Sequence, residues 1–384
     1  MAHVMIASLA VASRIEWQPL PHVIDRSKLL RSAAGAAGAL IWPRAAQSSG
    51  RLMNSVPEGA RAVKSIDGWP SIPVWPVWPT PTSPTGGRVT PITPAPSYAD
   101  PFLLIAHHRH SFSPGDPLRG PFKAVGGALG LPYVGDEGFR LHPHRGIDIW
   151  TYVLDGSDGF RHRDSLGGDC TYRGGACQFM RSGRGALHEE MWETRSDRPT
   201  KVELFQIWVN LPATMKMSPP AIRYLGDAWH APYDEASVVD ANGLVARVRT
   251  LGTPQLERAS VGDGEVLKPR PAVSVQHVGL EAGGSYTTAV PREHTALLYV
   301  RKGSVLVNGQ LLGEVRAGST CVFQRDGECV HLVAAGDAAA DALLLSGAPM
   351  NEPVALGGPI VMNTEAELQR AYAELRAGTF LDHA

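Results

Sequence analysis

Long hydrophobic runs are absent from this chain of 384 residues, in which no uninterrupted apolar stretch reaches the length of a membrane-spanning helix. A charge excess is absent as well, because 36 Lys and Arg residues face 37 Asp and Glu residues, for a formal net charge of −1. The chain therefore carries no basic footprint for nucleic acid. We expect a soluble, cytoplasmic protein with no membrane and no direct nucleic-acid partner.

Cysteine is scarce. The four cysteines are Cys170, Cys177, Cys321 and Cys329, and none of them forms a close CxxC pair. That spacing excludes a thiolate zinc site and a thioredoxin-like redox motif. A chain of this length with so few cysteines does not depend on disulfide bonds, which suits a reducing compartment.

Glycine and proline are abundant, with 41 and 31 residues, and this composition favours an all-β architecture with many turns. Short alternating runs predict strands at Ile147–Leu154, Ala176–Met180, Val202–Leu211, Ala272–Val278, Thr295–Val300, Ser304–Val307 and Ala342–Leu345. One helix is predicted near the end, where Thr364 and Glu367 form a capping box and Gly378 supplies a left-handed stop. We expect two small β-barrels in tandem and a short C-terminal helix.

The first part of the chain has a different composition. Residues 1–87 are predicted to be an extension outside the barrels. Within it, Arg26–Arg51 is rich in Arg, Ala and Ser and contains no acidic residue. This composition fits either an organellar transit peptide or a disordered extension, with Met53 as an alternative start. The Pro- and Trp-rich segment Gly68–Gly87 is predicted to be extended and not a central strand, because proline cannot donate to a sheet.

Two pairs of polar residues point to metal chemistry. His142 and His144 lie two residues apart, and His188 and Glu190 repeat that spacing about forty residues later. Residues at this spacing on a strand share one face, so neighbouring strands would direct three imidazoles and one carboxylate into a barrel. We therefore predict a single metal ion bound by these four side chains.

The mixed imidazole and carboxylate set favours iron(II), with manganese, nickel, cobalt or zinc as alternatives. Four protein ligands would leave open positions for dioxygen or a substrate. Asp148 is expected to make a supporting hydrogen bond, and Arg145 and His162 are expected either at the cavity mouth or on the surface.

The remaining histidines are predicted to have no role in binding metal. His107, His108 and His110 are expected in a loop. His294 and His331 lack a same-face partner, so no second metal is predicted.

Three sequence blocks, HPHRGIDIWTYVLDGSDGFRHRDSLGG, QFMRSGRGALHEEM and LFQIWVNLP, together with the tail MNEPVALGGPIVMNTEAELQRAYAELRAGTF, resemble the signature blocks of the pirin family in order. The resemblance implies a bicupin, with a metal-binding cupin at 88–215, a metal-free cupin at 216–350 and a C-terminal segment with a helix at 351–384. It also implies His142, His144, His188 and Glu190 as the ligands. The chain departs from the family pattern at Asp148, Ala176 and Phe179, which leaves the substrate open.

The resemblance implies two functions. The favoured hypothesis is a quercetin 2,3-dioxygenase-like oxidoreductase that uses iron(II) and O2 on a flavonol or related phenol, with Glu190 as ligand and catalytic base. The alternative is a non-catalytic, iron-dependent redox-sensing co-regulator that binds a protein partner, for which a nuclear location is implied. A storage or structural cupin is a third hypothesis. Pirin-like proteins are commonly monomeric, so we expect a monomer.

Overall fold

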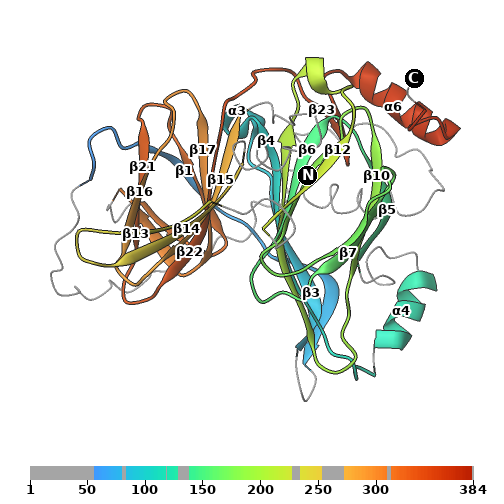
Figure 1. Ribbon diagram of the computed structural model, residues 1–384, viewed down its shortest axis with the longest axis horizontal. Helices are drawn as coiled ribbons and strands as arrows, with labels where there is room; N and C mark the ends of the chain where they lie inside the picture. The colour runs from blue at the N-terminus through green and yellow to red at the C-terminus, as the bar shows by residue number, and fades with distance from the viewer. Residues whose placement is uncertain are drawn as a thin grey trace, which may run out of the picture.

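The computed structural model describes residues 56–79, 84–117, 119–128, 138–226, 234–252, 272–308 and 313–382. Its regular structure is mostly β, arranged as two barrels side by side with a helix at the C-terminal end (Figure 1). The predicted fold class is confirmed. No helix in this part of the chain is long and apolar enough to cross a membrane. The transit-like segment Arg26–Arg51 lies outside the described residues.

Each barrel consists of a larger and a smaller antiparallel sheet. In the first barrel the larger sheet contains, in spatial order, β12 (Ala221–Leu225), β9 (Cys177–Arg181), β6 (Ile147–Val153), β11 (Thr200–Asn210), β4 (Phe102–Phe112), β3 (Pro84–Ile92) and β2 (Ile72–Pro79). The smaller sheet contains β5 (Gly138–His144), β10 (Ala186–Trp192), β7 (Phe160–Asp164) and β8 (Asp169–Tyr172).

The second barrel repeats this arrangement position by position. Its larger sheet contains β1 (Val63–Gly68), β20 (Ser319–Phe323), β17 (Thr295–Lys302), β22 (Ala340–Gly347), β15 (Val273–Leu280), β14 (Val245–Gly252) and β13 (Asp234–Val239). Its smaller sheet contains β16 (Ser285–Ala289), β21 (Cys329–Ala334), β18 (Ser304–Val307) and β19 (Glu314–Arg316). By sheet order, β16 and β21 therefore take the places that β5 and β10 hold in the first barrel.

The remaining elements connect or cover the barrels. They are α3 (Pro96–Ala99), α4 (Arg119–Ala128), the 3₁₀ turn η1 (Ala213–Met215), β23 (Ala355–Gly357), β24 (Ile360–Met362) and α6 (Glu365–Ala377). Helix α6 has the predicted capping box between Thr364 and Glu367, and it ends at Gly378 with φ +75°. Helices α3 and α4 were not predicted, because neither has a capping signal or a long apolar stripe.

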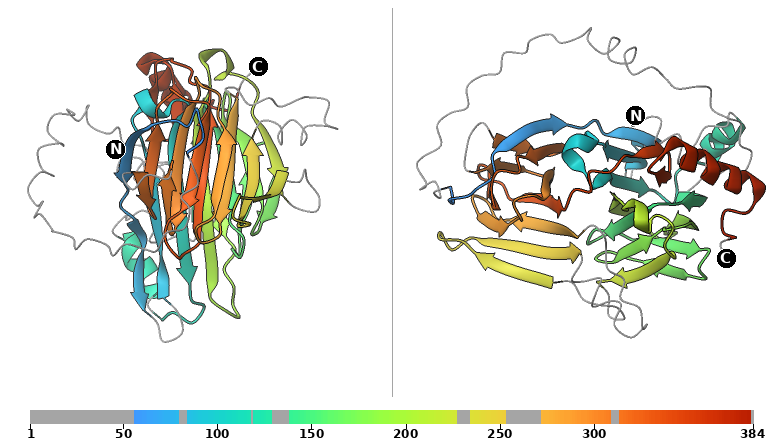
Figure 2. Two further views of the ribbon diagram at one scale, coloured as in Figure 1. Left: turned by 90° about the vertical axis from the view of Figure 1, so that its left-hand side faces the viewer. Right: turned by 90° about the horizontal axis from the view of Figure 1, so that it is seen from above.

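The predicted domain boundaries need correction at both ends of the first barrel. Strand β1 pairs with β20 of the second barrel, and β2 forms the edge of the first, so the segment before residue 88 crosses both barrels (Figure 2). Prolines are tolerated in β2 because an edge strand needs hydrogen bonds on one side only. Trp69 packs on the second barrel and donates to Thr320 Oγ1 at 2.9 Å. At the other boundary, β12 pairs with β9, so the first barrel continues beyond residue 215.

The two larger sheets pack face to face and share one hydrophobic core. Strand β11 is apolar on both faces, as predicted, because each of its faces packs against a different hydrophobic cluster. Phe205 and Ile207 face the second barrel, where they belong to the same cluster as Leu343 and Leu345. Leu204 and Trp208 point into the first barrel instead. The strand is therefore a wall that both domains share.

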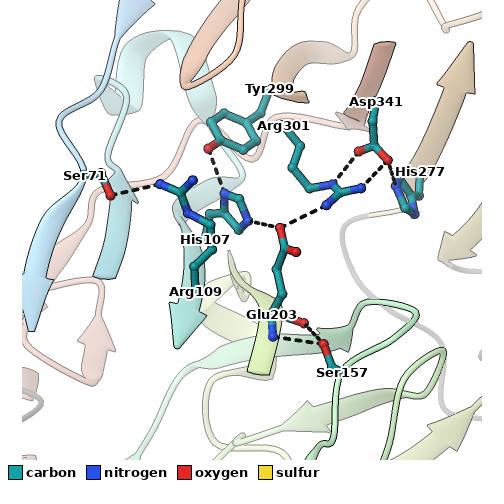
Figure 3. Close-up of polar contacts among 9 residues, drawn as sticks. All are labelled: Ser71, His107, Arg109, Ser157, Glu203, His277, Tyr299, Arg301 and Asp341. Carbon is teal, nitrogen blue, oxygen red and sulfur yellow. Dashed lines mark hydrogen bonds and ion pairs between the residues drawn. The ribbon is translucent and has the colours of Figure 1, made fainter. Parts of the chain in front are cut away.

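A chain of polar contacts crosses this interface (Figure 3). Glu203 Oε1 on β11 lies 2.9 Å from His107 Nε2 and 3.0 Å from Arg301 Nη1. Arg301 also donates from Nε and Nη2 to the two carboxylate oxygens of Asp341, at 2.6 and 2.5 Å. His277 Nε2 lies 3.1 Å from Asp341 Oδ2. One guanidinium therefore joins a carboxylate of the first barrel to a carboxylate of the second.

The predicted loop at His107, His108 and His110 is wrong, because all three residues lie in the central strand β4 and are buried. Alternation divides them between the two faces. His107 faces the interface, whereas His108 packs against Phe139 and His110 against Trp192 inside the first barrel. A histidine-rich sequence resembles a polar loop, but tertiary burial overrides that preference here.

Arg301→Met tests the interdomain chain. Burial alone would raise the pKa of Glu203, but hydrogen bonds from His107 and Arg301 hold this pKa at about 2. The folded pKa lies below the ordinary value, so this stabilisation is present above about pH 4.5 and is lost as the pH falls toward 2. Without the guanidinium we expect a loss of about 2–4 kcal/mol in the free energy of unfolding at neutral pH. Acid unfolding should also begin at higher pH.

The control is Arg316→Met, which removes an arginine paired with Glu314 at the surface. Exposed pairs contribute little, so the melting temperature of this variant should be unchanged. Equal effects of the two substitutions, measured by thermal and acid unfolding, would contradict the role assigned to Arg301.

Candidate metal centre

Strands β5 and β10 bring three histidines together inside the first barrel. Antiparallel pairing places His188 opposite His142 and Ala186 opposite His144. The ring centroids of the three imidazoles lie 4.4–4.9 Å apart, and one nitrogen from each ring falls within 4.8 Å of the others. All three side chains are buried. The structure thus confirms the predicted convergence of these three residues.

Two glycines allow close packing around the histidine strands, one between β5 and β10 and one against β24. Gly138, at the start of β5, has φ +141°, and a Cβ atom there would lie 2.2 Å from the Glu190 carbonyl oxygen. Gly146 follows His144 with φ +78°, and its Cβ would lie 2.0 Å from the Val361 carbonyl oxygen. A side chain at Gly138 would separate β5 from β10, and one at Gly146 would push β24 away from the turn after His144.

Hydrogen bonds orient two of the three rings. The Nδ1 atom of His142 lies 2.8 Å from the Arg140 carbonyl oxygen, and that of His144 lies 3.2 Å from the Pro359 carbonyl oxygen. Carbonyl oxygens accept only, so these Nδ1 atoms carry hydrogen and the Nε2 atoms offer lone pairs.

The buried ring nitrogens facing the centre have no partner. His144 Nε2 and both ring nitrogens of His188 make no hydrogen bond within the described residues. Burial is the main cause that lowers the pKa of all three histidines, that of His142 to about 4, so the imidazoles are neutral at neutral pH. Buried polar atoms normally have partners, and neutral imidazoles with free lone pairs are metal ligands. The donor set therefore fits a metal ion.

Glu190 is buried on β10, the strand that also carries His188, but it lies outside the three-histidine group. Its Oε1 accepts from Thr151 Oγ1 at 3.3 Å, and its Oε2 accepts from Gln206 Nε2 at 3.1 Å. Burial raises the pKa of Glu190 to about 7, and these two hydrogen bonds oppose that rise. Its predicted role as fourth ligand and catalytic base stays a prediction.

A fourth histidine lies beside the group. The His162 ring is 5.3 Å from that of His188, and His162 Nε2 lies 2.8 Å from Asp164 Oδ2. Both partners are buried, so the expected position at the mouth or on the surface is wrong. His162 and Asp164 are two residues apart on β7, which is the sequence signal that could have identified this pair.

Asp148 faces away from the histidine group. Arg181 donates to both of its carboxylate oxygens, at 3.0 and 2.9 Å, in a buried ion pair between β6 and β9. The expected hydrogen bond to the metal-binding residues is therefore replaced by a contact that joins two strands of the larger sheet.

The C-terminal segment packs over the turn that follows His144 at the end of β5. Arg145, expected at the mouth or on the surface, is buried and donates to Glu374 of α6 at 2.6 Å and to the Phe380 carbonyl oxygen at 3.0 Å. Lys216 Nζ donates to the carbonyl oxygens of Gly146 and Val361, at 3.0 and 3.1 Å. Together with the Pro359 contact, these bonds fix this turn from its outer side. No sequence pattern pointed to these contacts, since the partners are 70 or more residues apart.

The second barrel has no such donor set at the corresponding strands. The inward-facing residues on β16, and directly after it, are Tyr286, Thr288 and Val290. Those on β21 are Val330 and Leu332. None of them offers an imidazole or a carboxylate.

The chain is similar to proteins of one family. A match to the description "Pirin" covers residues 94–209, and a match to "Pirin C-terminal cupin domain" covers residues 275–381. A Pseudomonas aeruginosa protein named "Putative quercetin 2,3-dioxygenase" is 31% identical over 299 residues, which cover 76% of this chain and 92% of that protein. Pirin-1 of Arabidopsis thaliana is 30% identical over 236 residues, covering 61% of this chain and 75% of that protein.

The solved structures agree with these sequence matches. A crystal structure of quercetin 2,3-dioxygenase from Acinetobacter baumannii has a TM-score of 0.62 and 25% sequence identity, and the match covers 84% of this chain and 98% of that one. Both sets of comparisons span both barrels, and the barrels repeat one strand order. The chain belongs to the pirin family and consists of two pirin cupin domains.

Proposed function

We propose that the protein holds one iron(II) ion in its first barrel and acts as a dioxygenase on a flavonol or a related phenol. His142, His144 and His188 would bind the ion, with Glu190 as the fourth ligand. The observation that carries this proposal is the set of three buried, neutral imidazoles, in which His144 Nε2 and both ring nitrogens of His188 have no hydrogen-bond partner among the described residues. Nitrogen donors with one carboxylate suit iron(II) and leave open positions.

A bound iron(II) ion would supply the redox chemistry that lets dioxygen react with a closed-shell phenol. The side chains and carbonyl groups of the protein orient the ligands and bury the site. The Arg140 and Pro359 carbonyl groups hold two imidazoles in fixed orientation. Thr151 and Gln206 hold the Glu190 carboxylate on the barrel wall, and the ring centroid of Trp208 lies 5.4 Å from that of His144 in an edge-to-face arrangement.

Similarity supports the choice of reaction. The Pseudomonas aeruginosa relative and the Acinetobacter baumannii structure both carry the name quercetin 2,3-dioxygenase, the first as a putative assignment. For this chain we propose the same class of reaction, oxygenation of a flavonol or related phenol, and do not specify the substrate further. The phenol and O2 are the proposed partners, and the monomeric state stays a prediction.

His188→Ala tests the metal site. The variant removes the ring opposite His142, and the remaining donors should bind iron about 10–100-fold more weakly or not at all. Wild-type protein loaded anaerobically and desalted should retain one iron per chain by elemental analysis. The matched control is His331→Ala on β21 of the second barrel, which should retain the same amount. Iron retained equally by the two variants would show that the site is elsewhere.

Lys216→Met tests the support behind His144. The side chain is buried, burial lowers its pKa to about 8, and it donates to Gly146, Asn210 and Val361. Removing the amine takes a donor from three buried oxygen atoms, of which the Gly146 carbonyl keeps a bond from the Leu211 amide. We therefore expect a loss of about 2 kcal/mol in the free energy of unfolding. Metal affinity, measured well below the melting temperature, should fall by about tenfold because the His144 loop loses its anchor.

The control for this substitution is Lys201→Met, at an exposed position of β11. It should change neither stability nor metal affinity. A Lys216→Met protein that unfolds earlier but binds metal as tightly as wild type would refute the positioning role.

Oxygen uptake tests the reaction. Iron-loaded protein offered quercetin and related phenols should consume oxygen, and His144→Ala should not. Uptake that persists in this variant would exclude the histidine site as its origin. No uptake from protein shown to hold one iron would instead favour the redox-responsive binding protein.

A further inference from the structure

The second barrel contains a cavity of about 250 Å³. Its walls come from β15, β22, the end of β16 and the turn that follows. The polar side chains that line it belong to Ser274, Gln276, Thr288, His294 and Ser346. The cavity lies outside the metal centre, which belongs to the first barrel.

The place of the cavity matches that of the metal centre. By sheet order, β16, β22 and β15 correspond to β5, β11 and β4. In the first barrel, β5 carries His142 and His144, and β11 carries Gln206 and Trp208 beside them. The second barrel thus has a half-open pocket in the corresponding region, lined with different chemistry.

The lining is mostly apolar, and the polar side chains in it are uncharged. It contains no Asp, Glu, Lys or Arg, and Val290 and Leu344 form part of its apolar wall. The hydroxyl groups of Ser274 and Ser346 have no hydrogen-bond partner among the described residues. Gln276 makes only long contacts, to Thr288 Oγ1 at 3.4 Å and to the Tyr286 hydroxyl at 3.5 Å. Donors and acceptors therefore remain available to a ligand.

A buried arginine holds the rim of the cavity. Arg61, from the segment before β1, donates to the carbonyl oxygens of Pro291, Arg292 and His294. Burial, and then the nearby Arg61 charge, lowers the pKa of His294, so its imidazole is neutral at neutral pH. The turn is thereby fixed, and the cavity presents no full charge.

We propose that the second barrel is a metal-free binding site for a small, uncharged hydroxylated ring, of the dihydroxybenzene class. The apolar wall fits the ring, while the serine hydroxyls and the Gln276 amide can bond to two ring hydroxyls. A carboxylate would be buried without a cation and is disfavoured. The volume is below that of drug-sized pockets, which limits the ligand to one ring and the dissociation constant to roughly the millimolar range.

The test uses resorcinol as the probe and full-length, metal-free protein. Saturation-transfer NMR titration should show resorcinol binding, with benzoate as the charged control binding at least ~10-fold more weakly. Ser346→Leu fills the cavity and should weaken binding about tenfold or more. Ser274→Val is a second, milder variant that should act in the same direction if Ser346→Leu does not fold.

His188→Ala, in the first barrel, is the variant that separates the two sites. Resorcinol affinity unchanged in His188→Ala but reduced in the serine variants supports the proposal. Binding lost in His188→Ala places resorcinol at the metal centre and overturns the proposal. No binding to wild-type protein, or benzoate binding as tightly as resorcinol, overturns it too. The outcome does not depend on iron or oxygen uptake.

Discussion

The antiparallel pairing of β5 with β10 is the constraint on which the site depends. It sets His188 opposite His142 and brings His144 alongside, so three rings meet in one place. A shift of one residue would turn these side chains out of the barrel, because the side-chain period of a strand is two. The glycine at position 138 permits the close approach of β5 to β10 that this register requires.

The register is in turn fixed from outside the two strands. Strand β11 faces the first barrel with Gln206 and the second barrel with Glu203, so the interdomain polar chain and the site share one wall. On the other side, the C-terminal segment, which follows the second barrel in the sequence, packs against the first barrel. There it forms hydrogen bonds with His144 and Arg145. The metal centre therefore lies in the first barrel, but its geometry also depends on contacts with the C-terminal segment and on the wall shared with the second barrel.

Sequence alone gave much of this architecture. Alternating runs, the capping box at Thr364 and the two i, i+2 pairs are local signals, and the structure agrees with them because strand and helix periodicity fix which face a residue occupies. The burial of β4 and of Arg145, and the strand at residues 72–79, could not be predicted. The strand at residues 72–79 was missed because its prolines argue against a strand and are tolerated only at the edge of a sheet. The burial of β4 and of Arg145 depends instead on partners distant in sequence, β11 and α6. The cavity in the second barrel was missed for the same reason.

Anomalous X-ray diffraction at the iron edge, from crystals of iron-loaded protein, would test the central claim most directly. The account predicts one strong peak in the first barrel, between the inward nitrogens of His142, His144 and His188, and none in the second barrel. A peak elsewhere, or no peak from protein with one iron per chain in solution, would contradict the account.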